Sequence, residues 1–206
     1  MFVTLEGIDR SGKTTQAAML ARELGPDTLL LREPGGTPLG ERVRDLLLDP
    51  TLELDPGVEM LLFGAARAAL ATQVILPARR AGRDVVCDRF IDSTTAYQGV
   101  AGGIGIDHVE QFNAVVIDDC VPDLTLLLRI EPEEAERRGQ QRLEAGQRDG
   151  DDRFELQGIE FQRKVAAAYD ELAALHPERI TVVDAHGGPE EVHRRVVEAV
   201  TTASRA

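Results

Sequence analysis

The chain has 206 residues, 43% of them hydrophobic, which suits one globular domain spanning residues 1–206. Lys and Arg together number 23 against 36 for Asp and Glu, and the resulting net charge of −13 would repel DNA or RNA. No apolar stretch approaches the roughly 20 residues of a membrane span, and the N-terminus lacks a basic region followed by an apolar signal segment. We therefore expect a cytoplasmic protein with no nucleic-acid partner and no membrane association.

Five short runs rich in leucine or β-branched residues are typical of strands buried on both faces, at residues 2–6, 28–32, 84–88, 124–130 and 180–184. Segments with the apolar spacing of helices lie around them, at residues 13–24, 38–48, 57–82, 107–119, 132–145, 154–175 and 189–203. Strands that alternate with helices predict an α/β fold with a parallel sheet. The polar segment 136–153 contains three glycines and has the composition of a mobile flap.

Residues 7–14 read GIDRSGKT, which satisfies the pattern GxxxxGK[ST] directly after a predicted strand and at the start of a predicted helix. Glycines in such a loop let backbone N–H groups approach phosphate oxygens, while the lysine bridges the terminal phosphates and the threonine hydroxyl faces Mg²⁺. We therefore expect this loop to bind ATP through Gly7, Ile8, Asp9, Arg10, Ser11, Gly12, Lys13, Thr14 and Thr15.

A phosphate loop alone leaves two classes of protein open: an enzyme that passes the γ-phosphoryl group to an acceptor, and a nucleotide-gated switch or ATPase. A GTP switch would carry a guanine-reading Asn-Lys-x-Asp element, and no such string occurs. A motor or chaperone ATPase is more often larger than this chain. The sequence therefore favours phosphoryl transfer to a small acceptor.

The segment VVCDRFIDSTTAYQG, residues 85–99, places two charged residues at the end of a predicted strand. Asp88 lies where parallel sheets bind their ligands, so we expect it to assist Mg²⁺ together with Thr14, or to contact the loop lysine. The planar guanidinium of Arg89 suits a phosphate, although Asp88 and Arg89 could also form a local ion pair. Polar side chains follow at helical spacing, namely Ser93, Thr94, Tyr97 and Gln98.

These strings together resemble the thymidylate kinase family. The resemblance rests on EGIDRSGKTT (6–15), REPGGTPLGERVRDLLL (32–48), LLFGAAR (61–67), DRFIDSTTAYQG (88–99), PDLTLLL (122–128) and DRFE (152–155). It implies a P-loop kinase fold with a five-stranded parallel sheet and a mobile lid at about 136–153, and phosphorylation of dTMP to dTDP by ATP and Mg²⁺ for dTTP synthesis. Another nucleoside monophosphate or nucleoside kinase is the alternative. A homodimer through helices near 57–75 and 107–119 is also implied.

The resemblance assigns a role to each acceptor-side residue. Phe63 should stack on thymine, with Arg67 and Thr94 at the edge of the base, whereas the residues alone would make Phe63 core and Arg67 solvated. Asp9 should reach the 3′-hydroxyl, and Tyr97 should occupy the space of a 2′-hydroxyl. The full expected dTMP site is Asp9, Glu33, Pro34, Arg44, Phe63, Arg67, Arg89, Ser93, Thr94, Tyr97 and Gln98, with Arg44 and Arg89 on the phosphate.

The source of the cation that meets the transferring phosphoryl group stays open at this point. The loop carries Arg10, and the lid region offers Arg137, Arg138, Arg142, Arg148 and Arg153. Charge on the moving group is best met by a guanidinium held in place in advance, which favours Arg10 on the loop. The expected catalytic residues are Asp9, Arg10, Lys13, Arg89 and Arg153.

Overall fold

The computed structural model describes residues 1–144, 146, 153–154 and 157–204. Within these residues, five parallel strands form one sheet in the order β2-β3-β1-β4-β5. The strands are β1 (Phe2–Glu6), β2 (Leu29–Arg32), β3 (Val85–Asp88), β4 (Leu124–Arg129) and β5 (Ile180–Asp184). The predicted parallel α/β fold is confirmed, and each strand lies within two residues of its predicted bounds.

Helices connect the strands as the apolar spacing predicted. They are α1 (Lys13–Leu24), α2 (Pro38–Leu48), α3 (Pro56–Leu70), α4 (Leu76–Arg80), α5 (Ile91–Thr94), α6 (Ile106–Ile117), α7 (Pro132–Glu144), α8 (Gly158–Leu175) and α9 (Pro189–Ala203). Two segments widen to π-helical geometry, η1 (Ala71–Ile75) and η2 (Thr95–Ala101), so that residues 56–80 and 91–101 are continuous helical runs. Helix α8 begins later than predicted, at Gly158, where φ is 77°.

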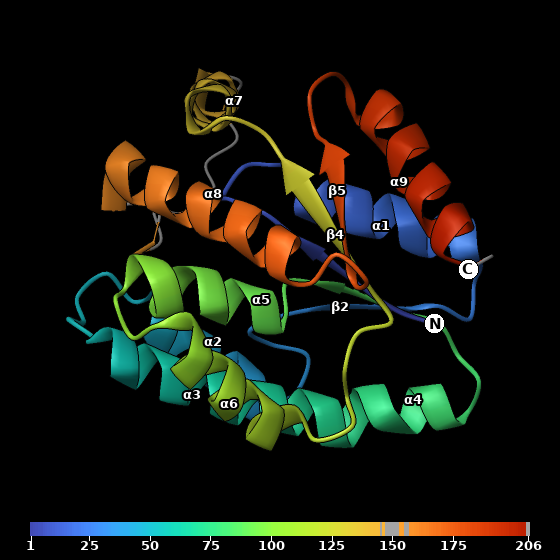
Figure 1. The fold of residues 1–206 in the computed structure, drawn as a ribbon, viewed down its shortest axis with the longest axis horizontal. Coiled ribbons are helices and arrows are strands. Elements are labelled where there is room, and N and C mark those ends of the chain that lie inside the picture. Colours follow the sequence, from blue (N-terminus) through green and yellow to red (C-terminus); the bar gives the residue numbers. More distant parts are fainter. Residues whose placement is uncertain (145, 147–152, 155–156, 205–206) are drawn as a thin grey trace.

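Helices cover both faces of the sheet (Figure 1). Helices α1 and α9 pack together on one side, while α8, η2, α3 and α6 form the layer on the other. Strand β1 lies at the centre of the sheet, and all five of its residues are buried. This burial on both faces explains why the strand sequence FVTLE shows no alternation of apolar and polar residues.

The strand register brings distant polar residues to one edge of the sheet. Leu5 in β1 and Arg32 in β2 are both paired with Asp88 in β3. The strands therefore end at the same edge of the sheet. This places three segments next to one another: the loop after β1, Glu33 after β2 and Arg89 after β3. Parallel sheets bind ligands at this carboxyl edge of their strands.

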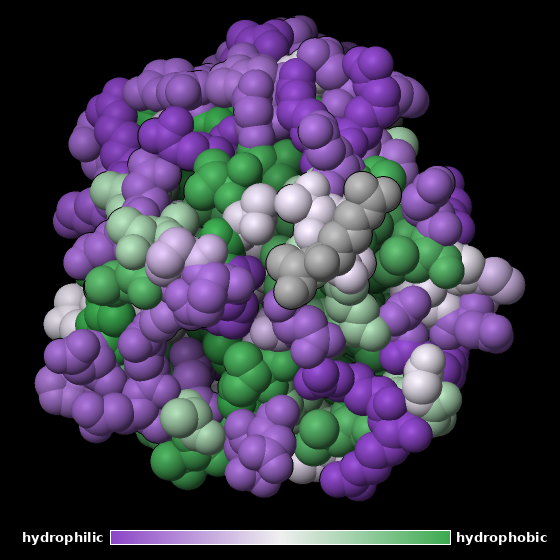
Figure 2. All heavy atoms as spheres, turned by 45° about the vertical axis from the view of Figure 1, so that its right-hand side comes forward, coloured by the Kyte–Doolittle hydropathy of each residue, from purple (hydrophilic) through white to green (hydrophobic). Residues whose placement is uncertain are grey.

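The helical run Pro56–Arg80 is more apolar than the sequence analysis allowed, but one such helix is weak evidence for a membrane span, because core helices have the same length and composition. It is 25 residues long, and its most apolar 18-residue window has a mean hydropathy of 1.5, so by length and composition it could cross a membrane. Arg67, near the middle of the run, is buried in polar contacts of the domain. Around the C-terminus, hydrophilic residues cover much of the surface with smaller hydrophobic areas between them (Figure 2).

The predicted lid lies partly outside the described residues. Residues 136–144 form the C-terminal part of α7, and Arg153 and Phe154 follow as a turn. Arg148 is outside the described part of the chain.

Candidate functional site

The phosphate loop between β1 and α1 contains three residues with positive φ. Gly7 has φ of 140° and Gly12 has φ of 100°, and a Cβ at Gly7 would lie 2.6 Å from the carbonyl oxygen of Leu128. Arg10 is also left-handed, with φ of 62°. The loop leads directly into α1 at Lys13. Backbone N–H groups at the N-terminus of this helix therefore line a position that favours an anion.

Lys13 is buried against this loop. Its Nζ donates to the carbonyl oxygen of Ile8 at 2.7 Å and lies 3.5 Å from the hydroxyl of Ser11. Burial, together with the positive charge of Arg89, lowers the pKa of Lys13 to about 8. The ammonium group would therefore gain from an anionic partner at the loop.

Thr14 and Asp88 meet beside the loop. The Thr14 hydroxyl donates to Oδ2 of Asp88 at 2.5 Å. The other carboxylate oxygen of Asp88, Oδ1, is buried and has no hydrogen-bond partner among the described residues. Buried polar atoms are nearly always satisfied in proteins, so this oxygen indicates a position for a cation or a water molecule.

Arg10 reaches across to helix α7. A Cβ at Gly139 would lie 2.7 Å from the Cζ, Nε and Nη1 atoms of Arg10. A residue larger than glycine at position 139 would therefore displace the guanidinium from its present position. The lid-side helix and the loop arginine are in direct contact.

Arg89 joins the phosphate loop to the turn after β3. Its guanidinium forms an ion pair with Asp9 of the loop and donates to the Ser93 hydroxyl at 3.0 Å and the Tyr97 hydroxyl at 3.2 Å. It also lies over the ring of Tyr97, 5.1 Å from the centroid. The alternative of a local pair with Asp88 is wrong, because Arg89 turns toward Asp9.

Asp9 is held in place from two sides. The side-chain amide of Gln162 in α8 donates to its Oδ2 at 2.7 Å, while Arg89 pairs with Oδ1. Burial would raise the pKa of Asp9, but the charges of Arg89 and Lys13 outweigh it and lower the pKa. The loop therefore presents an ionised carboxylate next to its lysine.

Glu6, the last residue of β1, anchors the turn that carries Arg89. It is fully buried and accepts hydrogen bonds from the Phe90 N–H at 2.7 Å, the Ser93 hydroxyl at 2.6 Å and the Tyr169 hydroxyl at 2.8 Å. Burial and the nearby Asp92 raise the pKa of Glu6. These contacts fix the start of α5, on which the polar residues 93 and 94 lie.

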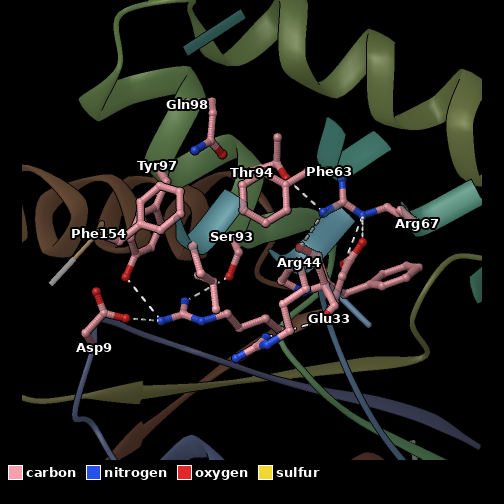
Figure 3. Close-up of a pocket in the computed structure, with 14 residues that line it drawn as sticks. Asp9, Glu33, Arg44, Phe63, Arg67, Ser93, Thr94, Tyr97, Gln98 and Phe154 are labelled. Carbon is pink, nitrogen blue, oxygen red and sulfur yellow. Dashed lines mark hydrogen bonds and ion pairs between the residues drawn. The ribbon is translucent and has the colours of Figure 1, made fainter. Parts of the chain in front are cut away.

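A pocket opens beside this network (Figure 3), and all of the residues expected on the acceptor side line it. Four aromatic residues line it, namely Phe63, Phe90, Tyr97 and Phe154. The ring centroid of Phe154 lies 6.0 Å from that of Phe63 and 6.0 Å from that of Tyr97. A second hollow adjoins it along the loop and contains Lys13, Thr14 and Asp88. Asp9, Glu33, Arg44 and Arg89 line both hollows.

Arg67 is buried at the base of the pocket, with only 1% of its surface exposed. Its guanidinium donates to Glu33, to Asn113 at 2.8 Å and to the hydroxyl of Thr94 at 2.8 Å. Burial raises the pKa of Glu33 to about 7, although the charge of Arg67 opposes this shift. The alternative of a solvated Arg67 is therefore wrong.

The arrangement is a phosphate loop adjoining a pocket lined by aromatic rings and arginines, and residues 5–196 match the family model described as Thymidylate kinase. The chain belongs to the thymidylate kinase family. The thymidylate kinase of Chlorobaculum tepidum is 41% identical, with 97% of this chain and 96% of the relative covered. That of Pelotomaculum thermopropionicum is 45% identical, with 96% and 91% covered. The crystal structure of thymidylate kinase from Ehrlichia chaffeensis aligns with a TM-score of 0.78, 34% identity and 98% coverage of both chains.

Three arginines of the predicted lid, Arg137, Arg138 and Arg142, lie on helix α7. Arg137 and Arg138 both pair with Glu134 on α7, and Arg138 also donates to the carbonyl oxygen of Ala185 at 2.8 Å. Arg142 lines the hollow beside the phosphate loop.

Arg153 was expected among the catalytic residues near ATP, but in the structure it lies against helices α2 and α3. Its Nη1 pairs with Oε1 of Glu59 in α3 at 2.6 Å, and its Nε donates to the carbonyl oxygen of Leu47 at 3.3 Å. Both side chains of the ion pair are about nine-tenths buried. The lid side therefore contacts the acceptor pocket through Phe154, the neighbour of Arg153 in sequence, whose ring lies near those of Phe63 and Tyr97.

Several side chains that organise the family's site were missed by sequence reasoning: Glu6, Glu59, Asn113, Phe154, Gln162 and Tyr169. Phe154 stands in the string DRFE, which did signal the family, but no pattern connected its ring to Phe63. The others lie on strands and helices far apart in sequence, and only the packing of those elements brings them to the pocket. No motif in the sequence could have identified Glu59 as a partner of Arg153.

The lowered pKa of Lys13 predicts how nucleotide binding depends on pH. The protonated amine binds phosphate, so affinity for ATP is full below about pH 8 and falls as the pH rises through that value. Between pH 7 and pH 9 we expect a loss of up to about tenfold, measured by calorimetry at constant ionic strength. The variant Lys13→Arg, whose guanidinium stays charged, should lose this dependence. An unchanged dissociation constant in the wild type over this range would contradict the role of Lys13.

Proposed function

We propose that the protein transfers the γ-phosphoryl group of ATP to dTMP, giving dTDP and ADP. The observation that carries the proposal is the pocket beside the phosphate loop, lined by every residue that the family resemblance assigned to the acceptor. Family membership of the whole chain supports the same activity. Asp9 belongs to both hollows, so one loop serves donor and acceptor.

On this proposal the acceptor enters between the aromatic rings. Thymine stacks on Phe63, and Arg67 and Thr94 face the edge of the base. Arg44 and Arg89 hold the 5′-phosphate, and Asp9 accepts from the 3′-hydroxyl. The Tyr97 hydroxyl, held by Arg89 at 3.2 Å, occupies the sugar side, where it would exclude a 2′-hydroxyl.

Mg²⁺ would be held at Thr14 and Asp88. The buried and unpartnered Oδ1 of Asp88 fits a cation or one of its water molecules, and the Thr14 hydroxyl lies within hydrogen-bond distance of the same carboxylate. Mg²⁺ characteristically takes one or two protein oxygens together with substrate phosphates and water. When bound, it would neutralise charge on the terminal phosphates of ATP.

Phosphoryl transfer requires alignment of donor and acceptor and cations around the moving group. Lys13 and Arg10 lie on the donor side, and Arg89 lies on the acceptor side. The phosphate loop holds the backbone of Arg10. The guanidinium of Arg10 lies against Gly139 of helix α7.

An acceptor panel tests the proposed activity. A coupled assay with Mg²⁺ and ATP should show the highest kcat/KM for dTMP among the nucleoside monophosphates. Faster phosphorylation of uridylate or adenylate would overturn the assignment to dTMP while keeping a nucleotide kinase. Hydrolysis of ATP that does not depend on any acceptor would restore the alternative of a nucleotide-gated ATPase.

The placement of Arg10 predicts that Arg10→Gly lowers kcat by about 10³-fold, because one guanidinium on the transferring group contributes that much. Glycine tolerates the positive φ of residue 10, so the loop should keep its shape. The Michaelis constants for ATP and dTMP should change little. Arg137→Ala, which removes an exposed arginine of α7, is the matched control and should stay near wild type. If Arg10→Gly retains wild-type kcat, the charge is supplied from elsewhere.

We also propose that two copies associate through α3 and α6. Large apolar side chains are exposed on these helices: Leu61 on α3 is 61% exposed and Val115 on α6 is 84% exposed. Only 39% of the apolar window in the run Pro56–Arg80 is buried within the chain. Sedimentation equilibrium at micromolar concentration should give the mass of a dimer, and Val115→Arg should shift it toward the monomer. A wild-type monomer would refute the interface.

A further inference from the structure

The side chain of Gln98 presents one satisfied end and one unsatisfied end. Its Nε2 donates to Oε2 of Glu59 at 2.7 Å. Its carbonyl oxygen Oε1 is buried and has no hydrogen-bond partner among the described residues. Figure 3 shows the amide of Gln98 pointing toward the part of the pocket that contains Phe63 and Thr94. A buried acceptor that lacks a donor indicates a position where a ligand or a water molecule supplies one.

The orientation of this amide follows from chemistry. An ionised carboxylate can only accept hydrogen bonds. The guanidinium of Arg153, which has only donors, forms an ion pair with Glu59, with its Nη1 2.6 Å from Oε1 of the carboxylate. Each oxygen of Glu59 therefore faces a donor, Arg153 on one side and Gln98 on the other. The NH₂ group of Gln98 must point to Glu59, which leaves its carbonyl oxygen for the ligand.

We propose that Glu59 is a positioning residue that sets the base specificity of the pocket through Gln98. The unpartnered carbonyl of Gln98 accepts from a ring N–H, so the pocket selects bases that carry this donor next to a carbonyl. Thymine and uracil have such an N3–H, whereas the N3 of cytosine is an acceptor and would face the oxygen of Gln98. This inference rests on the proposed function, because it concerns the base of the acceptor nucleotide.

The isosteric change Glu59→Gln should invert the chain of hydrogen bonds. Arg153 has only donors, so it would hold the carbonyl oxygen of the new glutamine. The NH₂ group of residue 59 would then point at Gln98, and Gln98 would turn its own carbonyl toward residue 59. The NH₂ group of Gln98 would face the pocket, where it matches the N3 of cytosine and opposes the N3–H of thymine.

The experiment compares dTMP with 5-methyl-2′-deoxycytidine monophosphate, which keeps the C5 methyl group and differs in the base only at N3 and C4. Glu59→Gln should lower the ratio of kcat/KM for dTMP over the cytidine analogue by about tenfold or more, because a mismatched buried polar group discriminates strongly. The change should appear in KM, with kcat for dTMP within about threefold of wild type. The exposed Glu53→Gln on the segment before α3 is the control and should leave the ratio unchanged.

A double-mutant cycle with Gln98→Met separates this role from a purely structural one. Methionine has no carbonyl to orient, so Glu59→Gln should not change the ratio further on that background. A ratio that is unchanged in the folded Glu59→Gln variant would overturn the proposal, and so would an equal fall in the Gln98→Met background. Failure of the wild type to phosphorylate dTMP would instead refute the proposed function.

A second measurement uses the wild-type protein, in case Glu59→Gln does not fold. In a crystal structure of the complex with dTMP, Oε1 of Gln98 should lie within about 3.2 Å of N3 of the base. A complex in which N3 donates to another group, with Gln98 out of reach, would overturn the proposal.

Discussion

The ion pair between Asp9 and Arg89 is the interaction on which the rest of the site depends. It connects the phosphate loop after β1 to the turn after β3. These two strands are neighbours in the sheet, and their carboxyl ends lie side by side. Arg89 has φ of 69°, an uncommon conformation for a residue with a side chain. That backbone conformation is retained because the guanidinium is held by Asp9, Ser93 and Tyr97 at once. The phosphate loop and the turn after β3 are therefore fixed relative to each other.

A buried polar layer behind the pair supplies its rigidity. Glu6 accepts hydrogen bonds from the backbone and side chains of the turn that follows Arg89, and Tyr169 of α8 completes the layer. Buried polar groups are costly when unpaired and specify one arrangement when fully paired. The layer therefore restricts the orientation of the arginine, while the sheet itself is stabilised by apolar burial.

The sequence predicted the sheet and the phosphate loop well because both are local in character. A strand buried on both faces shows in its own composition, and GxxxxGK[ST] carries the glycines that its backbone conformation needs. The place of Arg153 was not predictable in this way, because its partner Glu59 lies on a helix far away in sequence. Arg67 was read as a solvated residue from the sequence alone for the same reason: its partners Glu33 and Asn113 come from other elements.

The contact between Arg10 and Gly139 has a consequence for how the two positions can vary. The absence of a side chain at 139 provides the volume that the guanidinium occupies, so the two residues form a steric pair across 129 positions of sequence, from 10 to 139. A bulky residue at 139 would be compatible with a small residue at 10, but not with an arginine in its present rotamer. Across related chains, we expect a large residue at one of these positions to accompany a small residue at the other. The pair would then indicate whether the loop or the helix provides the cation for the transferring phosphoryl group.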